Sequence, residues 1–279
     1  MIHLWYSITD IIPFGWLQFM FMKNALLAIV LVTPIFGIMG TMVVNNRMAF
    51  FADALGHSTL TGIAIGVILG IPNPLWSMVG FALLFSVGIL IVKNGNKAST
   101  DTVIGVFSSM AVALGIVILS RGGGFNKYSA YLIGDLLSIT PGEVGMLALV
   151  LIAVIVFWVF SFNKLLLVSI NESLAKSRGI KIHLMEVLFT LLVAVIVTIS
   201  IQWIGLLIIN SLLILPAAGA RNIAINAKQY HFFSVAISLI SGILGLIFSY
   251  YWGTATGATI ILISAIFFFI TFFIKKFVN

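Results

Sequence analysis

The stretch MAFFADALGHSTLTGIAIGVILG (residues 48–70) carries one acid and one imidazole within a run of apolar and small residues long enough to cross a membrane. Asp53 and His57 are four residues apart, so on an α-helix both side chains face the same way, about 6 Å from each other. A charged group at bilayer depth is costly, and for that reason it normally faces a cavity and has a function there. Carboxylate oxygen and imidazole nitrogen suit zinc, manganese and iron. The stretch therefore predicts a membrane helix with a metal-accepting pair on one face.

The rest of the chain has the composition of a membrane protein. Of its 279 residues, 62% are hydrophobic and only 8% are charged. Apolar stretches of about 17–25 residues recur from end to end, and each is long enough to cross a hydrocarbon core of about 30 Å. We therefore predict an all-α polytopic membrane protein with a single transmembrane domain over residues 1–279. We expect nine transmembrane helices, or eight if the last two segments before residue 222 form one long crossing. The predicted spans are 24–44, 49–70, 75–92, 102–119, 144–161, 186–202, 204–221, 232–251 and 255–274.

The basic residues predict the orientation of these spans, because Lys and Arg collect on the cytoplasmic side. The N-terminus is expected outside and the C-terminus in the cytoplasm, which requires an odd number of crossings. In this orientation the inner side holds Arg47, Lys93, Lys97, Lys164, Lys176, Arg178, Lys181, Arg221, Lys228, Lys275 and Lys276, and the outer side holds Lys23, Arg121 and Lys127. The net charge of +7 thus reflects topology, and no nucleic-acid partner is expected.

Segments outside the spans have their own patterns. Residues 1–22 are amphipathic and include Trp5, Tyr6 and Trp16, which is typical of a segment lying at the membrane interface. The outer loop 120–143 has a glycine run and a partly apolar centre, so we expect it to dip back towards the bilayer.

The inner loop 162–185 is expected to contain a short independent helix over 170–178. Ser169 and Glu172 have the spacing of a capping box, and Gly179 is placed to end the helix as its C′ residue. A helix of two to three turns is marginal alone in water, so it needs something to dock into.

The segment 48–70 also has a packing face. Gly62, Gly66 and Gly70 recur every four residues and predict that another helix lies closely against this side. Thr61 extends the polar stripe that begins at Asp53, on a different face of the helix.

Each member of the metal-accepting pair has an alternative interpretation. Asp53 could stabilise the start of a helix as its N-cap, although it lies five to six residues into the span. His57 could be a core histidine bonded to a neighbouring helix. If the pair binds a metal, a third ligand is expected from Asn45, Asn46, Thr61 or Asn210, and the sequence selects none of them.

The chain has neither cysteine nor a nucleotide-binding motif. The absence of cysteine excludes disulfides and thiolate metal sites. The sequence G-x-x-x-x-G-K-[ST] does not occur, so the chain cannot bind ATP through a P-loop. We expect no enzymatic activity, and any ATP hydrolysis that drives transport must take place on a separate chain.

Four blocks carry a family resemblance, in order along nearly the whole chain. They are NNRMAFFADALGHSTLTGIAIG (45–66), TDTVIG (100–105), YLIGDLLSITPGE (131–143) and SLLILPAAGAR (211–221). Together they resemble the membrane permease subunits of bacterial metal-uptake ABC transporters, the zinc/manganese/iron permease family. Ala52 and Gly56 replace the Gly and Ser that are usual before the acid and the histidine, and neither change removes a ligand.

The resemblance implies a complex in the bacterial inner or cytoplasmic membrane. Its partners would be a second copy of the permease, two cytoplasmic ATPase subunits and an extracytoplasmic metal-binding protein. Asp53 and His57 fall on the positions of the pore metal ligands. The helix 170–178 would be the coupling helix that docks on the ATPase, with the candidate coupling residues Ser169, Glu172, Leu174, Ala175, Arg178 and Gly179.

The resemblance also implies that the metal is cargo, so no permanently bound cofactor is expected. The block at 131–143 is more similar to zinc members than to manganese members, which favours Zn²⁺ over Mn²⁺ or Fe²⁺. Two other classes are possible from the residues alone. One is an ion-coupled secondary carrier in which the Asp/His pair relays protons. The other is a membrane-embedded metalloenzyme, which would need further ligands.

Overall fold

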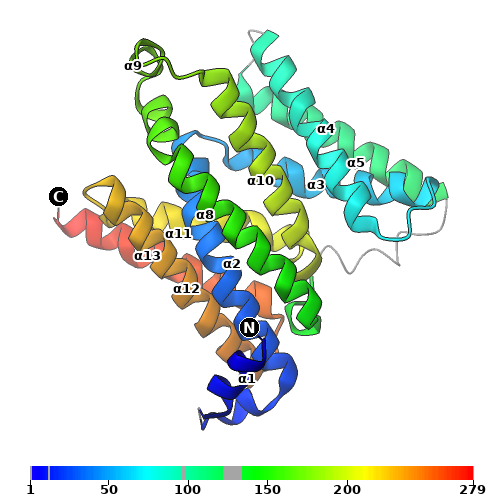
Figure 1. Ribbon diagram of the computed structural model, residues 1–279, viewed down its shortest axis with the longest axis vertical. Coiled ribbons are helices and arrows are strands. Elements are labelled where there is room, and N and C mark those ends of the chain that lie inside the picture. The colour runs from blue at the N-terminus through cyan, green and yellow to red at the C-terminus, as the bar shows by residue number, and fades with distance from the viewer. Residues whose placement is uncertain (1, 12, 96–98, 122–133, 279) are drawn as a thin grey trace. The chain divides into compact units, whose positions relative to one another are not determined.

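The chain is helical throughout its described part (Figure 1). The computed structural model describes residues 2–11, 13–95, 99–121 and 134–278, and these contain no β-strand. The predicted all-α fold is therefore confirmed. Half of the predicted outer loop 120–143, including its glycine run, lies outside the described residues. The long helices are α2 (Met20–Asn45), α3 (Ala49–Ile68), α4 (Pro74–Gly95), α5 (Thr100–Arg121), α8 (Pro141–Ile170), α10 (Ile182–Ile204), α11 (Leu206–Ile223), α12 (Ala227–Trp252) and α13 (Thr256–Val278).

Each predicted span coincides with one long helix. Eight of these helices are long and apolar enough, over the described residues, to cross a membrane, and α11 is outside that set. The chain is thus a multi-pass membrane protein. Its eight candidate spans lie within the predicted range of eight to nine. The segments between 186 and 221 form two helices, because the chain leaves the helical conformation at Gly205, whose φ is 92° and ψ is 150°. The alternative prediction, that both segments form one long crossing, is therefore wrong.

The helices form two compact units. Unit 1 comprises Met1–Val44, Asp135–Val159 and Ser211–Asn279, and unit 2 comprises Asn45–Gly134 and Phe160–Asn210. The predicted metal pair and the predicted coupling helix both belong to unit 2.

Unit 1 is packed through small residues. A Cβ added at Gly37 would lie 2.7 Å from the Cα of Val235 on α12, and one added at Gly40 would lie 2.0 Å from the carbonyl oxygen of Leu213 on α11. The Ser234 hydroxyl also donates a 2.7 Å hydrogen bond to the Gly37 carbonyl. Helix α2 therefore approaches its neighbours backbone to backbone, as small residues allow in membrane helices.

The N-terminal segment is attached to the start of α2. It consists of the helix α1 (Ile2–Ile11) and a 3₁₀ turn, η1 (Gly15–Gln18). The Trp5 indole donates a 2.9 Å hydrogen bond to the carbonyl of Lys23, and the Tyr6 hydroxyl donates a 2.7 Å bond to Asn24 Oδ1. These aromatic residues thus fix α1 against α2, and the interfacial position of residues 1–22 stays a prediction.

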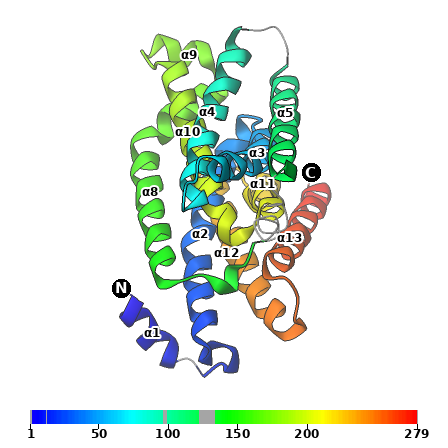
Figure 2. The ribbon, with the colours of Figure 1, turned by 90° about the vertical axis from the view of Figure 1, so that its right-hand side faces the viewer.

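Helix α3 of unit 2 packs against α4, α5 and α10 (Figures 1 and 2). The predicted glycine face receives α4. A Cβ at Gly62 would lie 2.8 Å from the Cα of Met78, and one at Gly66 would lie 2.2 Å from Ser77 Oγ. This contact confirms the predicted close packing at two of the three glycines.

Gly70 has a different role from the other two glycines. Its φ is 65°, and a Cβ at this position would meet no atom within 4 Å. The Ile71 amide donates 2.9 Å to the Gly66 carbonyl, and the Gly70 amide donates 3.2 Å to the Val67 carbonyl. These two bonds form a Schellman motif in which Gly70 is the C′ residue. The prediction that Gly70 lies in the packing face is therefore wrong, because α3 ends at Ile68.

The close contact between α3 and α4 predicts an asymmetry between glycines. Gly62→Ala should lower the apparent Tm of the purified protein by about 5 °C, as expected for about 1–2 kcal/mol of overpacking in a chain of this size. Gly80→Ala is the matched control, because Gly80 is on α4 with no atom within 4 Å of its added Cβ. Equal Tm values for both variants, measured by thermal unfolding in detergent, would contradict this packing.

Candidate metal site and coupling helix

Helix α3 presents Asp53 and His57 on one face. The helix begins at Ala49 after Met48, and no side chain caps it. Asp53 is the fifth residue of the helix, too far along to bond the free amides of its first turn. The interpretation of Asp53 as an N-cap is therefore wrong.

The two side chains are close but not hydrogen-bonded. His57 Nε2 lies 3.8 Å from Asp53 Oδ2, and the side chains are 34% and 47% exposed, respectively. A hydrogen bond would require about 3.2 Å or less between these atoms. Two ligands of a tetrahedral zinc ion at about 2.0–2.1 Å stand about 3.3 Å apart. A small change of rotamer would therefore bring this carboxylate and this imidazole to one cation.

Asn210 on α11 is the third polar group at this position. Its Nδ2 lies 3.4 Å from Asp53 Oδ1, a long contact for a hydrogen bond. Its Oδ1 is buried and has no hydrogen-bond partner among the described residues. A buried amide oxygen without a partner is unfavourable. If the Asn210 amide were rotated by 180°, its oxygen would face the Asp53 carboxylate. Two oxygen atoms facing each other in this way are favourable only if a cation lies between them.

The other three candidates for a third ligand are placed elsewhere. The Thr61 hydroxyl is buried and donates to the Ala111 carbonyl of α5, so it is already used in helix packing. Asn45 and Asn46 line a separate cavity, together with Lys93. Within the described ranges, no three His, Cys, Asp or Glu side chains could hold a metal together. Of the four predicted candidates for a third donor, the Asn210 amide is therefore the one that the structure places beside Asp53.

The face of α3 that carries Asp53 opens to a cavity of about 410 Å³ between α3 and α5. Asp101 lies in the first turn of α5, as expected for an acid at a helix N-terminus, and it also lines this cavity. This second carboxylate was not among the site residues predicted from the sequence. A signal was present, because Asp101, Gly105 and Ser108 share a helical face at spacings of four and three. The cavity is lined by Phe50, Asp53, Ala54, Asp101, Ile104, Gly105, Ser108 and Ser109.

The predicted short helix is present as α9 (Glu172–Ser177), but its cap differs from the prediction. Asn171 is the N-cap, and its side chain accepts a 3.0 Å hydrogen bond from the Leu174 amide. Ser169 is still part of α8, where its hydroxyl donates to the Leu166 carbonyl. The predicted capping box at Ser169 is therefore wrong, because α8 continues to Ile170 and only Asn171 has the extended backbone that a cap requires.

The end of α9 agrees with the prediction. Gly179 has a φ of 72°. Its amide donates 2.9 Å to the Lys176 carbonyl, and the Ile180 amide donates 3.1 Å to the Ala175 carbonyl. This is a Schellman motif with Gly179 at C′.

The surface of α9 is suited to docking. Ala175 is fully buried against the protein, whereas Leu174 is 43% exposed. Glu172 and Arg178 are also exposed. The helix region thus exposes one apolar side chain, Leu174, and three charged side chains, those of Glu172, Lys176 and Arg178. The role of these residues in coupling stays a prediction.

His231 is a structural histidine of unit 1. Its Nδ1 lies 2.7 Å from the Ala227 carbonyl, and its Nε2 lies 2.9 Å from the Thr41 hydroxyl. Both ring nitrogens therefore have polar partners within the fold.

Comparison with known proteins gives the family. Residues 18–275 match the ABC 3 transport family. The High-affinity zinc uptake system membrane protein ZnuB of Buchnera aphidicola subsp. Baizongia pistaciae is 34% identical over 260 residues, covering 92% of this chain and 95% of the relative. The Manganese import system permease protein ScaB of Streptococcus parasanguinis is 31% identical over 267 residues, covering 96% and 95%, respectively.

A solved structure agrees with these relatives. PsaBC from Streptococcus pneumoniae in complex with Fab matches with a TM-score of 0.80 and 29% identity, covering 98% of this chain and 95% of that chain. The chain therefore belongs to the ABC 3 transport family, and the predicted resemblance to permeases of metal-uptake ABC transporters is confirmed.

The observed cap of α9 leads to a testable difference. Asn171→Ala should destabilise the first turn of α9 by about 1 kcal/mol, which corresponds to about fivefold faster hydrogen exchange of its amides. Ser169→Ala should leave that exchange unchanged, because its hydroxyl bonds within α8. Hydrogen–deuterium exchange with mass spectrometry on the purified protein measures both. Faster exchange in Ser169→Ala with normal exchange in Asn171→Ala would reverse the assignment.

Proposed function

We propose that this chain is the membrane permease subunit of an ATP-driven importer for a divalent transition metal, and that Zn²⁺ is its cargo. The observation that carries the proposal is the meeting of Asp53, His57 and the Asn210 amide, with Asp53 also lining a cavity, in a member of the ABC 3 transport family. The metal is the substrate of transport, so the site binds it only in passing.

The donor set suits transient binding. One carboxylate, one imidazole and one amide leave at least one coordination position to water, unlike the closed four-ligand cage of a structural zinc site. A transport site must bind well enough to accept an ion and weakly enough to release it. The partial exposure of Asp53 and His57 supports access of a hydrated ion to the pair.

The preference for zinc rests on the relatives. A second ZnuB, from Haemophilus influenzae, is 32% identical and covers 90% of this chain. A set with one nitrogen and two oxygens is also acceptable to manganese and iron, and ScaB is almost as similar as the two ZnuB proteins. Zn²⁺ is therefore proposed as the preferred cargo, with Mn²⁺ or Fe²⁺ as the alternatives.

The proposed complex contains four kinds of partner. ATP would bind to cytoplasmic ATPase subunits, which contact α9, and an extracytoplasmic protein would deliver the metal. A second copy of the permease and the lipid bilayer of the bacterial cytoplasmic membrane complete the assembly.

The orientation follows from the distribution of charge in unit 2. Arg47, Lys93 and Lys176 line one cavity and so lie at the same end of the unit. In the proposed topology this end faces the cytoplasm, because basic residues collect there. If α11 is counted as a ninth crossing, this topology places the N-terminus outside and the C-terminus inside.

Removing either member of the metal-accepting pair tests the function. In proteoliposomes that contain the permease, its ATPase and its binding protein, Asp53→Ala or His57→Ala should lower zinc uptake by about 100-fold, since loss of even an outer partner of a metal ligand costs about 10–100-fold. ATP hydrolysis should continue. Excess Zn²⁺ should compete with labelled zinc better than Mn²⁺ or Fe²⁺.

His183→Ala is the matched control, because this histidine lies at the start of α10 and lines the other cavity. Normal uptake by both Asp53→Ala and His57→Ala would refute the metal site. Uptake by the permease alone with an ion gradient, without the ATPase, would instead indicate a secondary carrier.

The role of Asn210 is tested separately. Asn210→Ala should raise the half-saturating zinc concentration by about tenfold, because the site loses its third protein ligand. Asn210→Asp, which keeps an oxygen donor, should restore much of the affinity. Asn45→Ala is the control, since Asn45 lines the other cavity. An unchanged half-saturating concentration in Asn210→Ala would show that water supplies the third position.

A further inference from the structure

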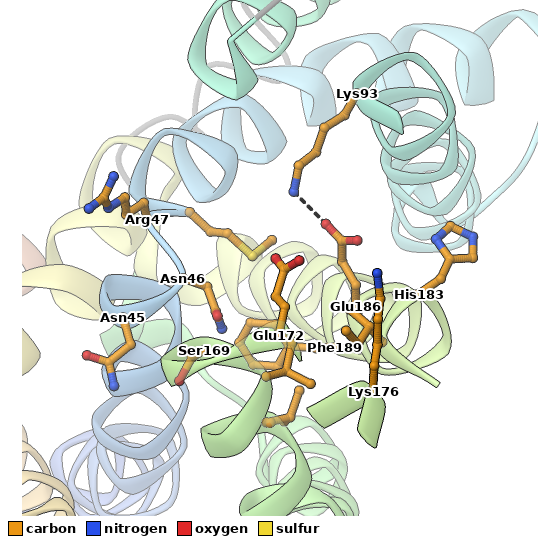
Figure 3. A pocket seen from close by; sticks show the side chains of 14 residues that line it. Asn45, Asn46, Arg47, Lys93, Ser169, Glu172, Lys176, His183, Glu186 and Phe189 are labelled. Carbon is orange, nitrogen blue, oxygen red and sulfur yellow. Dashed lines mark hydrogen bonds and ion pairs between the residues drawn. The ribbon is translucent and has the colours of Figure 1, made fainter. Parts of the chain in front are cut away.

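A cavity of about 510 Å³ lies at the end of unit 2 that carries α9 (Figure 3). Five parts of the chain meet around it: the turn after α2, the end of α4, the end of α8, helix α9 and the start of α10. Charged groups of both signs gather here, whereas the neighbouring helices are mostly apolar. The polar residues of its lining are Asn45, Asn46, Arg47, Lys93, Ser169, Glu172, Lys176, His183 and Glu186.

One ion pair crosses this cavity. Lys93 Nζ, at the end of α4, lies 2.5 Å from Glu186 Oε1 on α10, and the side chains are 32% and 23% exposed, respectively. Figure 3 shows the Lys93 side chain reaching across to the Glu186 carboxylate. The pair is therefore a direct polar link between α4 and α10, in addition to their packing contact.

The α10 end of this link is closely tied to α9. Only Gly179, Ile180 and Lys181 separate the C-cap residue of α9 from the first residue of α10. The Schellman bonds of Gly179 and Ile180 hold this connection in a fixed turn. Glu186 is the fifth residue of α10, about 6 Å along the helix axis from its start. A displacement of α9 would therefore reach Glu186 through a short, constrained path.

The α4 end of the link leads to the candidate metal site. Helix α4 lies on the glycine face of α3, with the Cα of Met78 2.8 Å from the position of a Gly62 Cβ. Such a contact has no side chain between the two backbones, so α3 cannot easily slide while α4 stays in place. Asp53 and His57 are on α3, so a shift of α4 would be transmitted to the pair.

We propose that Lys93 and Glu186 form an ion-pair latch that opens and recloses in each transport cycle, and that it positions the metal-site helix α3 according to the state of the coupling helix α9. The proposal rests on the proposed function. Lys93 and Glu186 are positioning residues, because they act on Asp53 and His57 through α4 and do not touch the metal.

The composition of the cavity explains how the latch can open without leaving a bare charge. Ion pairs that keep partial contact with water are weak and exchange partners readily. Helix α9 contributes one further acid, Glu172, and one further base, Lys176, to the same cavity, and Figure 3 shows the Glu172 carboxylate directed into it. When α9 moves, Lys93 can pair with Glu172 and Glu186 with Lys176. The long flexible Lys stems make this exchange possible.

The chain contains no cysteine, so a reversible cross-link can test the opening directly. The double variant Lys93→Cys/Glu186→Cys is assembled with its ATPase and binding protein in proteoliposomes and treated with a reducible bifunctional thiol reagent. This variant lacks the ion pair, so its own uptake before treatment is the reference. The latch predicts that cross-linking lowers that uptake by at least about tenfold, and that reduction restores it. The two single-cysteine variants, treated in the same way, should be unaffected.

Uptake by the cross-linked complex equal to that of the reduced complex would overturn the latch, because the pair would then be a static contact. This result differs from failure of the proposed function, in which the unmodified complex itself takes up no metal.

Charge reversal gives an independent test. Lys93→Glu and Glu186→Lys should each lower the metal taken up per ATP hydrolysed by about tenfold. The zinc affinity of the permease should stay within about twofold of the original value, because coupling is lost and the ligands are retained. The double variant Lys93→Glu/Glu186→Lys should recover at least half of the original ratio. A double variant that is no better coupled than the single variants would overturn the role of the ion pair.

Discussion

The fold of unit 2 is governed by the cost of holding a carboxylate and an imidazole within a membrane helix. In an apolar medium an isolated charge is strongly unfavourable, so it must be paired, hydrated or coordinated. Helix α3 is surrounded by α4, α5 and α10, yet the side chains of Asp53 and His57 keep 47% and 34% of their surfaces exposed. The helices thus enclose α3 on its glycine face and leave Asp53, on its polar face, open to a cavity. This division between a packed face and an open face makes the same helix both a structural centre and a candidate site.

Close packing and chemistry are linked by residue size. Gly62 and Gly66 allow α4 to touch the α3 backbone, and Gly115 of α5 approaches Thr61 so closely that an added Cβ would lie 2.9 Å from its amide nitrogen. Contacts of this kind do not yield to small forces, because no flexible side chain can absorb the movement. A motion of α4 or α5 must therefore move α3 as well. The cavity with the Lys93–Glu186 pair lies at the end of α4, where such a motion can be started from α9.

Much of this architecture was predictable from the sequence, because a span needs only sufficient apolar length, and each predicted span coincides with a long helix. Predictions that depend on a single residue, such as the position of a helix cap, were less accurate. Ser169 and Asn171 are both good cap residues, and only the continuation of α8 to Ile170 decides between them. The second carboxylate, Asp101, was missed because its cavity exists only where α5 packs on α3. Likewise, four residues were equal candidates for a third ligand until packing placed the Asn210 amide beside Asp53.

The position of Asn210 also explains how a site of this kind can change its affinity. Asp53 and His57 share one helix, so their separation is nearly fixed. Asn210 follows the break at Gly205, whose φ of 92° is accessible to glycine and unfavourable for other residues. The backbone of Gly134 packs directly against this break. A Cβ added at Gly134 would lie 2.3 Å from the Gly205 amide nitrogen. A small change of backbone at Gly205 would move the Asn210 amide relative to the pair while α10 keeps its contacts with α3 and α4. In the proposed importer, the third ligand is thus the one that can be withdrawn, and its withdrawal leaves two ligands that hold the ion too weakly to retain it.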